Sequence, residues 1–168
     1  MRRAVEYARN NNIWVVAAAG NYDAEMPEAV DLNQYPLYPI CFRDDKNYPL
    51  AIGVGSIDED GGLSAFSNFG SRCVLFSAQG SNIASTLYFD PAIEDLRYLS
   101  GSYLHGTSFA APMVTGALAY AKSINPTLTA KQQLDFLLAS SENIDNLNPS
   151  LAGHIGSGFA LVADMLSG

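Results

Sequence analysis

The sequence predicts an α/β fold with a mostly parallel sheet, on three observations. A helical segment at residues 1–12 leads directly into the apolar run Ile13–Ala19, and a helix followed by a buried strand is half of an α/β crossover. Further apolar runs at Leu50–Ile57 and Cys73–Ser77 are typical of strands inside a parallel sheet. A helix rich in small residues, at 108–122, follows these strands. Together the segments indicate one domain in which helices pack against a sheet.

The first helix and the first strand set up this arrangement. Residues 1–12 form an amphipathic helix end, with Ala4, Val5 and Ala8 on one face. The segment has no N-terminal capping residue, which indicates that it is the end of a longer helix. Ile13–Ala19 is apolar without interruption, and we therefore expect this strand to be buried on both faces of the sheet.

The middle of the chain is predicted to be rich in loops. Four prolines within residues 20–49 indicate a long loop without a regular element, in which no pocket residue is assigned. The acidic residues of segment 58–62 lack the ligand spacing of a calcium loop, so a solvated turn is expected there. Residues 86–103 alternate aromatic and polar positions, which predicts a β-hairpin.

Helices dominate the last third of the predicted fold. One helix is expected at 108–122 and a second at about 129–140, beginning at Thr129. The turn Gly156–Gly158 then precedes a closing helix at Ala160–Leu166.

Composition argues against several classes of partner. The chain has 168 residues, of which 48% are hydrophobic and 15% charged, as in a single globular domain. Its net charge is −8 and the acidic residues are scattered, so the basic patch that nucleic acid or an anionic membrane requires is missing. No apolar run approaches the roughly 20 residues of a membrane span. No apolar segment follows Arg2-Arg3, and we therefore expect no signal peptide in this sequence.

Two cysteines, Cys41 and Cys73, allow at most one disulfide. The sequence does not say whether they meet in space. We expect buried free thiols, because free cysteine behaves as a small apolar side chain.

The stretch that carries most chemical information is Leu104–Gly116. Here Gly106-Thr107-Ser108 runs directly into an apolar helix. A helix N-terminus has unpaired N–H groups and partial positive charge, which stabilise negative charge developing at a nearby hydroxyl. A serine is also a common N-cap, so the same pattern fits a capped core helix without chemistry.

A resemblance favours the chemical interpretation. The segment Gly106–Pro112 resembles the Gly-Thr-Ser-x-Ala-x-Pro nucleophile motif of the subtilisin-like serine proteases, the subtilases. Four further segments resemble subtilase signatures in the right order, namely Val15–Asn21, Ala51–Asp58, Leu63–Gly70 and Ala78–Thr86. The resemblance implies a three-layer α/β fold with helices on both faces of the sheet, and a serine endopeptidase activity on polypeptide substrates.

The resemblance also implies roles for individual residues. Ser108 matches the catalytic nucleophile, and Asn21 matches the side-chain donor of the oxyanion hole, with the Ser108 N–H as its partner. Ala18, Ala19 and Gly20 match one wall of the primary substrate pocket, where small residues leave room for a large side chain. An asparagine after a glycine also fits a plain turn residue, which is the alternative for Asn21.

The general base is missing from the expected place. The subtilase order is Asp, His, then Ser, yet the 20 residues before Asn21 contain neither His nor Asp. His105 is expected to be a hairpin-end residue and His154 a loop residue, not a base. We therefore expect residues 1–168 to be the C-terminal portion of a single subtilase catalytic domain, incomplete at its N-terminal side and inactive alone. Its partner would be the missing N-terminal half.

Two alternatives stay open at this stage. A pseudoprotease of the same fold would serve as a binding module, and its full gene would also lack the Asp or the His. An unrelated α/β hydrolase or nucleotide-binding fold is disfavoured, because Gly53–Gly55 is a weak phosphate-loop signal and Ser108 lacks a Gly-x-Ser-x-Gly elbow. No cofactor or metal is predicted, although calcium is common in the family. Family membership favours a secreted or periplasmic location.

Overall fold

The computed structural model describes residues 1–22, 28–94 and 97–158. The closing helix predicted at Ala160–Leu166 lies outside these residues. In chain order the elements are α1 (Arg2–Asn10), β1 (Val16–Ala18), β2 (Ile52–Ile57), β3 (Val74–Gln79), β4 (Ile83–Thr86), β5 (Ser100–Leu104), α2 (Thr107–Ile124), α3 (Ala130–Ala139), the short 3₁₀ helices η2 (Asp145–Leu147) and η3 (Pro149–Leu151), and β6 (Ser157–Gly158).

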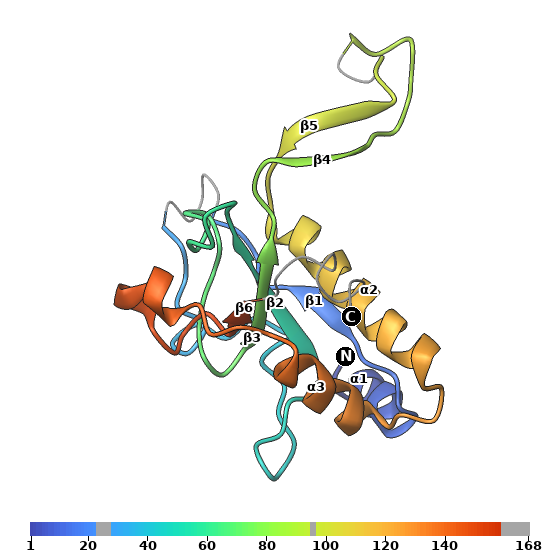
Figure 1. The fold of residues 1–168 in the computed structure, drawn as a ribbon, viewed down its shortest axis with the longest axis vertical. Coiled ribbons are helices and arrows are strands. Elements are labelled where there is room, and N and C mark those ends of the chain that lie inside the picture. The colour runs from blue at the N-terminus through green and yellow to red at the C-terminus, as the bar shows by residue number, and fades with distance from the viewer. Residues whose placement is uncertain (23–27, 95–96, 159–168) are drawn as a thin grey trace.

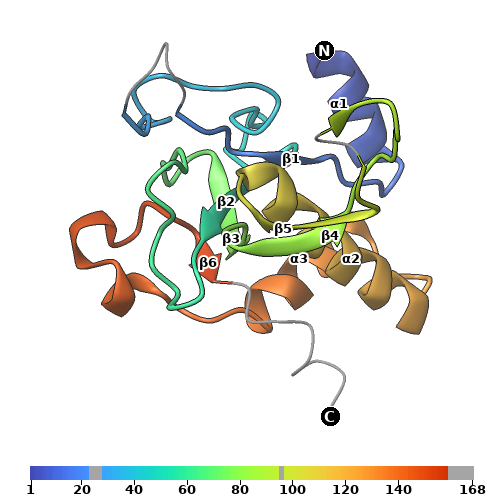
Figure 2. The same ribbon diagram turned by 90° about the horizontal axis from the view of Figure 1, so that it is seen from above.

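The predicted α/β fold is confirmed. Four strands form a sheet in the order β1-β2-β3-β6, and every neighbouring pair in it is parallel. Successive side chains of a strand point to opposite faces of a sheet. Val16, the first residue of β1, packs in the cluster with α2 and α3, whereas Val15, just before it, packs with Val5 of α1. Helices therefore cover both faces, and the sheet lies between them (Figures 1 and 2).

The main core lies between the sheet and helix α2. Small residues of α2 are fully buried against strands β2 and β3, namely Ala110, Val114 and Ala117. Their short side chains let the helix approach the sheet closely around Phe76, which is also fully buried. This packing anchors the start of α2 near the carboxyl ends of the strands, where ligands bind in open parallel sheets.

Strand β1 differs from its prediction. It is shorter than the apolar run Ile13–Ala19, its three residues are only partly buried, and Ile13 is 58% exposed. The reason is its place at the edge of the sheet, where β2 is its one neighbour among the described residues. A sequence suited to an interior strand therefore borders solvent on one side.

The connecting segments follow the prediction more closely. Between β1 and β2 the described residues form turns and isolated bridges, without a helix or strand. Asp58 Oδ1 accepts hydrogen bonds from the N–H groups of Asp60 and Gly62 at 3.0 and 2.9 Å, as in a solvated turn. A hairpin is confirmed as the antiparallel pair β4–β5, but its first strand lies at Ile83–Thr86, earlier than predicted; the hairpin extends beyond the body of the molecule (Figure 1).

Helix α3 begins where the sequence places it. Thr129 is its N-cap, and its side chain and that of Gln132 form a reciprocal capping box. The indole N–H of Trp14 donates to the carbonyl of Ala130 at 2.8 Å, which ties the helix start to the segment before β1. No helix in the described part of the chain is long and apolar enough to cross a membrane.

The expectation of free thiols at Cys41 and Cys73 is wrong. The two residues form a disulfide, because the loop after β1 folds back over the sheet and brings their Cα atoms to 4.4 Å. Ile40 and Cys73 are buried in the same apolar cluster, which also contains Ala19 and Leu32. The contact joins positions 32 residues apart, and no local pattern in the sequence reports such a pairing.

Removing this disulfide is expected to destabilise the chain by about 4 kcal/mol. The value follows from the loop entropy that a crosslink over 32 residues removes from the unfolded state. Urea unfolding of a Cys41→Ser/Cys73→Ser variant under oxidising conditions measures it. A reducing agent should cause a similar loss in the parent and none in the variant, so an equal effect on both would contradict the expectation.

Candidate active site

The start of helix α2 presents Ser108 to solvent. Gly106 is the N-cap residue, with a φ of +151°, and its N–H donates to the carbonyl of Gly80 at 2.8 Å. Thr107 is fully buried, whereas Ser108, the second residue of the helix, is exposed. The glycine permits the sharp entry into the helix, and the helix then holds the serine hydroxyl at its positive end.

Thr107 joins the helix start to the turn after β1. The side-chain oxygen of Asn21 accepts two hydrogen bonds from Thr107, one from its N–H and one from its hydroxyl, both at 2.9 Å. The same hydroxyl accepts a hydrogen bond from the N–H of Gly20 at 3.2 Å. Because both donors of Thr107 require an oxygen, they fix the orientation of the Asn21 amide.

This orientation leaves the amide nitrogen of Asn21 available. Its Nδ2 lies beside Gly106, 3.4 Å from the point where a Cβ on that glycine would sit. Among the described residues, no acceptor pairs with Asn21 Nδ2 or with the backbone N–H of Ser108. The N–H of the second residue of a helix has no acceptor within that helix, and the Ser108 N–H is in this position. Two donors that no described residue uses therefore lie near Gly106, at 3.4 Å (Asn21 Nδ2) and 3.8 Å (Ser108 N) from the point where its Cβ would sit.

The backbone of Asn21 is held as firmly as its side chain. Gly20 adopts a left-handed conformation with a φ of +87°, which turns the chain sharply after β1. The neighbouring groups then pair with the turn at 66–68: Tyr22 N–H donates to Phe66 at 2.9 Å, and Asn68 N–H donates to Gly20 at 3.0 Å. Asn21 is therefore both a residue of the turn after β1 and the holder of a side-chain donor, Nδ2, whose orientation is fixed.

A buried row of hydroxyls lies behind Gly80. Ser56 and Ser64 are hydrogen-bonded through their Oγ atoms at 2.7 Å, and Ser64 and Ser81 at 2.8 Å. A Cβ on Gly80 would stand 2.5 Å from Ser56 Oγ and 2.7 Å from the carbonyl oxygen of Gly106. The absence of a side chain at Gly80 therefore lets the turn before Ser108 pack directly on this network.

Replacing Gly80 by alanine is expected to lower the free energy of unfolding by about 1–3 kcal/mol, the usual cost of overpacking. The control is Gly116→Ala on helix α2, where an added Cβ meets nothing within 4 Å. That change should be neutral or stabilising by up to about 1 kcal/mol, because alanine favours helix. Urea unfolding of both variants measures the difference, and equal effects would contradict the close packing at Gly80.

An apolar cavity of about 250 Å³ opens beside Gly20. It is lined by Val30, Leu32, Tyr35, Leu37 and Asn68. The Asn68 amide is fixed, since its Nδ2 donates to the Ala19 carbonyl at 3.1 Å and its Oδ1 accepts from Val30 N–H at 2.9 Å. The cavity can therefore take an apolar side chain.

The three predicted wall residues lie at different depths. Gly20 borders the cavity, and a Cβ there would stand 2.9 Å from Asn68 Nδ2 and 3.3 Å from Leu37 Cδ2. Ala19 is fully buried in the core, with its carbonyl bound to Asn68. Ala18 is partly buried on β1, one position before it. Only Gly20 of the three is therefore in direct reach of the cavity.

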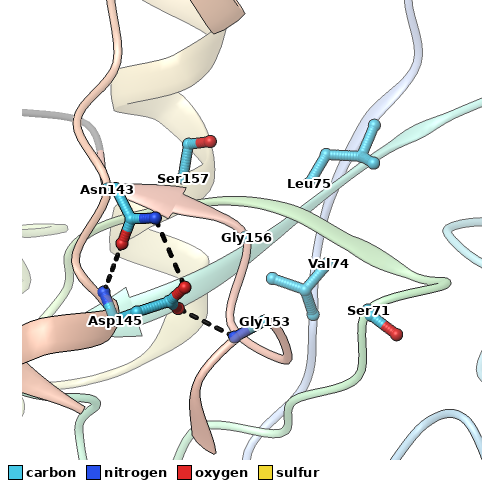
Figure 3. A pocket seen from close by; sticks show the side chains of 8 residues that line it. All are labelled: Ser71, Val74, Leu75, Asn143, Asp145, Gly153, Gly156 and Ser157. Atoms are coloured by element: carbon cyan, nitrogen blue, oxygen red, sulfur yellow. Dashed lines mark hydrogen bonds between the residues drawn. The ribbon is translucent and has the colours of Figure 1, made fainter. Parts of the chain in front are cut away.

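A second cavity, of about 280 Å³, is polar and lies at the start of β3 beside β6 (Figure 3). Its carboxylate belongs to Asp145, which accepts hydrogen bonds from the N–H of Gly153 at 2.8 Å and from the amide of Asn143 at 3.3 Å. Both carboxylate oxygens therefore hold the loop together. The described residues contain no group of three or more His, Cys, Asp or Glu side chains placed to bind a metal.

Neither histidine is hydrogen-bonded to Ser108 in the described part of the chain. His105 follows β5 and is exposed, and its Nδ1 accepts from the N–H of Asn82 at 3.3 Å. His154 lies in the loop before β6, 3.4 Å from the Asn33 amide. The predicted positions at a hairpin end and in a loop are both confirmed.

Two features of the site are not evident from the sequence. In the sequence, Thr107 is recognisable only as part of the Gly-Thr-Ser turn. Its position next to Ser108 is the one sequence signal for its contact with Asn21. The cavity residues Val30–Leu37 lie in the long loop for which the sequence assigns no pocket position. Asn68 belongs to a segment that resembles a family signature, but its contact with Ala19 depends on the fold.

Comparisons with known proteins show the family of this chain. The model of the subtilase family, Peptidase S8, matches residues 1–158. Subtilisin DY of Bacillus licheniformis is 32% identical over 86% of this chain and 45% of its own length. The major intracellular serine protease of Bacillus subtilis is 37% identical over 73% of this chain and 32% of its own. An extracellular serine proteinase of Thermus sp. is 32% identical over 80% and 28%.

The solved structure of MycP1 without its N-terminal propeptide shares the fold with a TM-score of 0.64 and 28% identity, covering 94% of this chain and 51% of that one. The chain thus spans about half, or less, of the length of the proteins that it matches. The family model covers nearly all of it. The chain belongs to the subtilase family of serine proteases.

Proposed function

We propose that this chain forms the C-terminal portion of the catalytic domain of a serine endopeptidase, with Ser108 as nucleophile. The observation that carries the proposal is the pair of hydrogen bonds from Thr107 to the side-chain oxygen of Asn21. They turn the amide nitrogen outward beside Gly106, so that a second donor accompanies the free N–H of Ser108. Two donors close to one exposed hydroxyl are the elements of an oxyanion hole.

In the proposed reaction, Ser108 Oγ attacks the carbonyl carbon of the scissile peptide bond. The carbonyl oxygen gains negative charge, which Asn21 Nδ2 and the Ser108 N–H stabilise by hydrogen bonding. Helix α2 adds its partial positive charge at the same end. Collapse of the tetrahedral intermediate breaks the C–N bond, and the amine leaves with the proton that the base took from Ser108. Water then attacks the acyl group left on Ser108, which releases the carboxylic acid product and restores the hydroxyl.

The proton of the Ser108 hydroxyl requires a base. No described residue is hydrogen-bonded to this hydroxyl, and the 20 residues before Asn21 contain neither His nor Asp. We propose that the aspartate and histidine belong to the N-terminal half of the domain, which the family order places upstream. The unpaired edge of β1 is the surface on which that half would continue the sheet.

The cavity beside Gly20 suits the substrate residue before the scissile bond. Its lining is apolar except for Asn68, whose polar groups are already paired. An apolar side chain of the substrate would lose contact with water there without leaving a polar group unpaired. Ala18 and Ala19 would support this wall from behind, and Gly20 would form its surface.

A pseudoprotease remains the second candidate, because the described residues place no base against Ser108. The two candidates differ in a simple experiment. A fluorophosphonate probe is added to the chain alone and to the chain expressed with the upstream half of its gene. Labelling of Ser108 only in the second case supports the peptidase, and no labelling in either case supports the binding module.

We infer an exported, secreted or periplasmic protein. The Cys41–Cys73 disulfide supports this inference, because disulfides persist in oxidising compartments. The similar proteins include both an extracellular and an intracellular protease. No cofactor enters the proposed reaction.

A further inference from the structure

We infer that the β4–β5 hairpin binds the substrate polypeptide. The bound segment of the substrate would be extended, and it would lie outside the cavity beside Gly20. The inference rests on the proposed function, since the bound polypeptide is the substrate of Ser108. The hairpin here means residues 83–94 and 97–104. Its strands are Ile83–Thr86 and Ser100–Leu104.

The hairpin exposes an unusual number of large apolar side chains. Tyr88, Tyr98 and Tyr103 are 73%, 71% and 75% exposed, and Leu99 is 68% exposed. The hairpin extends away from the body of the molecule (Figure 1). Exposed large apolar side chains concentrated in one segment are typical of interaction surfaces.

The backbone of the hairpin is also suited to binding an extended chain. β4 and β5 form a two-stranded sheet, so each strand has one paired and one unpaired edge. A polypeptide can add to such an edge through main-chain hydrogen bonds, which depend little on its sequence. At about 3.4 Å per residue, the five residues of β5 would bind a segment about five residues long.

Its position ties the hairpin to the active site. β5 ends at Leu104, four residues before Ser108. The foot of the hairpin is held by the hydrogen bonds from Gly106 N–H to Gly80 and from Asn82 N–H to His105 Nδ1. A chain bound along the hairpin would therefore stand in a set position relative to the nucleophile.

Tyr103 lies at an irregularity of the β4–β5 pairing, where the register shifts between Ile83 and Ser85. It has a φ of +60°, a left-handed conformation that a tyrosine rarely adopts, and it lies within a strand. Such an irregularity in the pairing re-aims a side chain, and bulges are over-represented next to active sites. Here it accompanies a side chain that is 75% exposed, five residues before Ser108.

Charge favours a substrate over a second copy of the chain as the occupant. Residues 83–104 contain three acidic side chains and one basic one, and the whole chain has a net charge of −8. Two copies meeting through this hairpin would repel, whereas a polypeptide with apolar and basic residues would be attracted.

The test measures binding separately from catalysis. A fluorescein-labelled ten-residue peptide with alternating valine and lysine is titrated with the Ser108→Ala chain, and fluorescence anisotropy gives the Kd. The triple variant Tyr88→Ser/Tyr98→Ser/Tyr103→Ser is expected to raise the Kd at least tenfold. The control Tyr7→Ser/Ile124→Ser/Leu147→Ser, which changes side chains 72%, 63% and 57% exposed elsewhere, should stay within twofold. Equal effects of the two triples would overturn the inference.

Two further measurements distinguish substrate binding from a purely structural role of Tyr103 and from self-association. Tyr103→Gly should raise the Kd while leaving the Tm unchanged or higher, because glycine relieves the strained backbone; a lower Tm with unchanged Kd would overturn a binding role for Tyr103. Sedimentation that shows a dimer in the parent and a monomer in the hairpin triple would assign the surface to a second copy instead.

The hairpin inference and the proposed peptidase fail in different ways. Both are measured on the chain expressed with its upstream half, peptide binding in the Ser108→Ala form and labelling with Ser108 intact. A hairpin triple that binds the peptide as tightly as the parent would overturn the hairpin inference, even where fluorophosphonate labels Ser108. Peptide binding without any labelling of Ser108 would overturn the proposed peptidase.

Discussion

Replacing Ser108 by alanine is expected to abolish fluorophosphonate labelling of the chain when its upstream half is present, and to lower kcat for peptide hydrolysis about 10⁶-fold. The magnitude is the one measured for the nucleophile of subtilisin itself. The physical reason is that the Ser108 hydroxyl stands at the start of α2 beside two free donors. Mass spectrometry of the labelled peptide and hydrolysis of a chromogenic peptide provide the measurements.

The matched control for this change is Ser123→Ala. Ser123 lies on the same helix and is also exposed, but its hydroxyl donates to the carbonyl of Tyr120 at 2.7 Å near the far end. Labelling should be unaffected by that substitution. Strong labelling of the unmodified 168-residue chain by itself would contradict the inference that the base lies outside it.

Replacing Asn21 by alanine is expected to lower kcat about 10²–10³-fold, with a smaller effect on KM. The magnitude is again that of subtilisin, for the oxyanion-hole asparagine. In this chain the expected loss has a specific structural basis, since the amide nitrogen is one of two donors beside Ser108 and is oriented by Thr107. Steady-state kinetics on the complete domain measure it.

Asn21→Asp separates the chemical role from a structural one. A carboxylate can still accept both hydrogen bonds from Thr107, so the free energy of unfolding should change little. It cannot donate to the oxyanion, and its charge opposes the charge that develops there, so kcat should fall at least as far as in Asn21→Ala. A variant that unfolds more easily yet keeps its kcat would assign Asn21 a role only in the turn. Thr107→Ser, which keeps the hydroxyl and the N–H, should retain activity.

Local patterns in the sequence predict the elements because each pattern acts within a few residues. The apolar runs mark β2 and β3, Thr129 and Gln132 mark the start of α3, and the Gly-Thr-Ser turn marks the start of α2. The candidate nucleophile is found in the same way. A serine at a helix start follows from its immediate neighbours, and the family motif covers those same neighbours.

Other features depend on contacts between distant positions. The edge position of β1, the disulfide between Cys41 and Cys73, and the cavity formed by Val30–Leu37 each require knowing which segments meet. The strand itself is confirmed, but the burial expected for it is wrong, because an apolar run reports how a strand would be buried with neighbours on both sides. It does not report whether both neighbours are present.

The sequence by itself therefore determined the α/β class, the candidate nucleophile and the absence of a base before Asn21. The tertiary structure decided how the Asn21 amide is oriented. Thr107 is 86 residues away along the chain, and only folding brings its hydroxyl and N–H against the asparagine oxygen. That contact selects which end of the amide faces Ser108, because two donors can be satisfied only by the oxygen. The sequence therefore provides the amide donor of Asn21, and the fold alone determines its orientation.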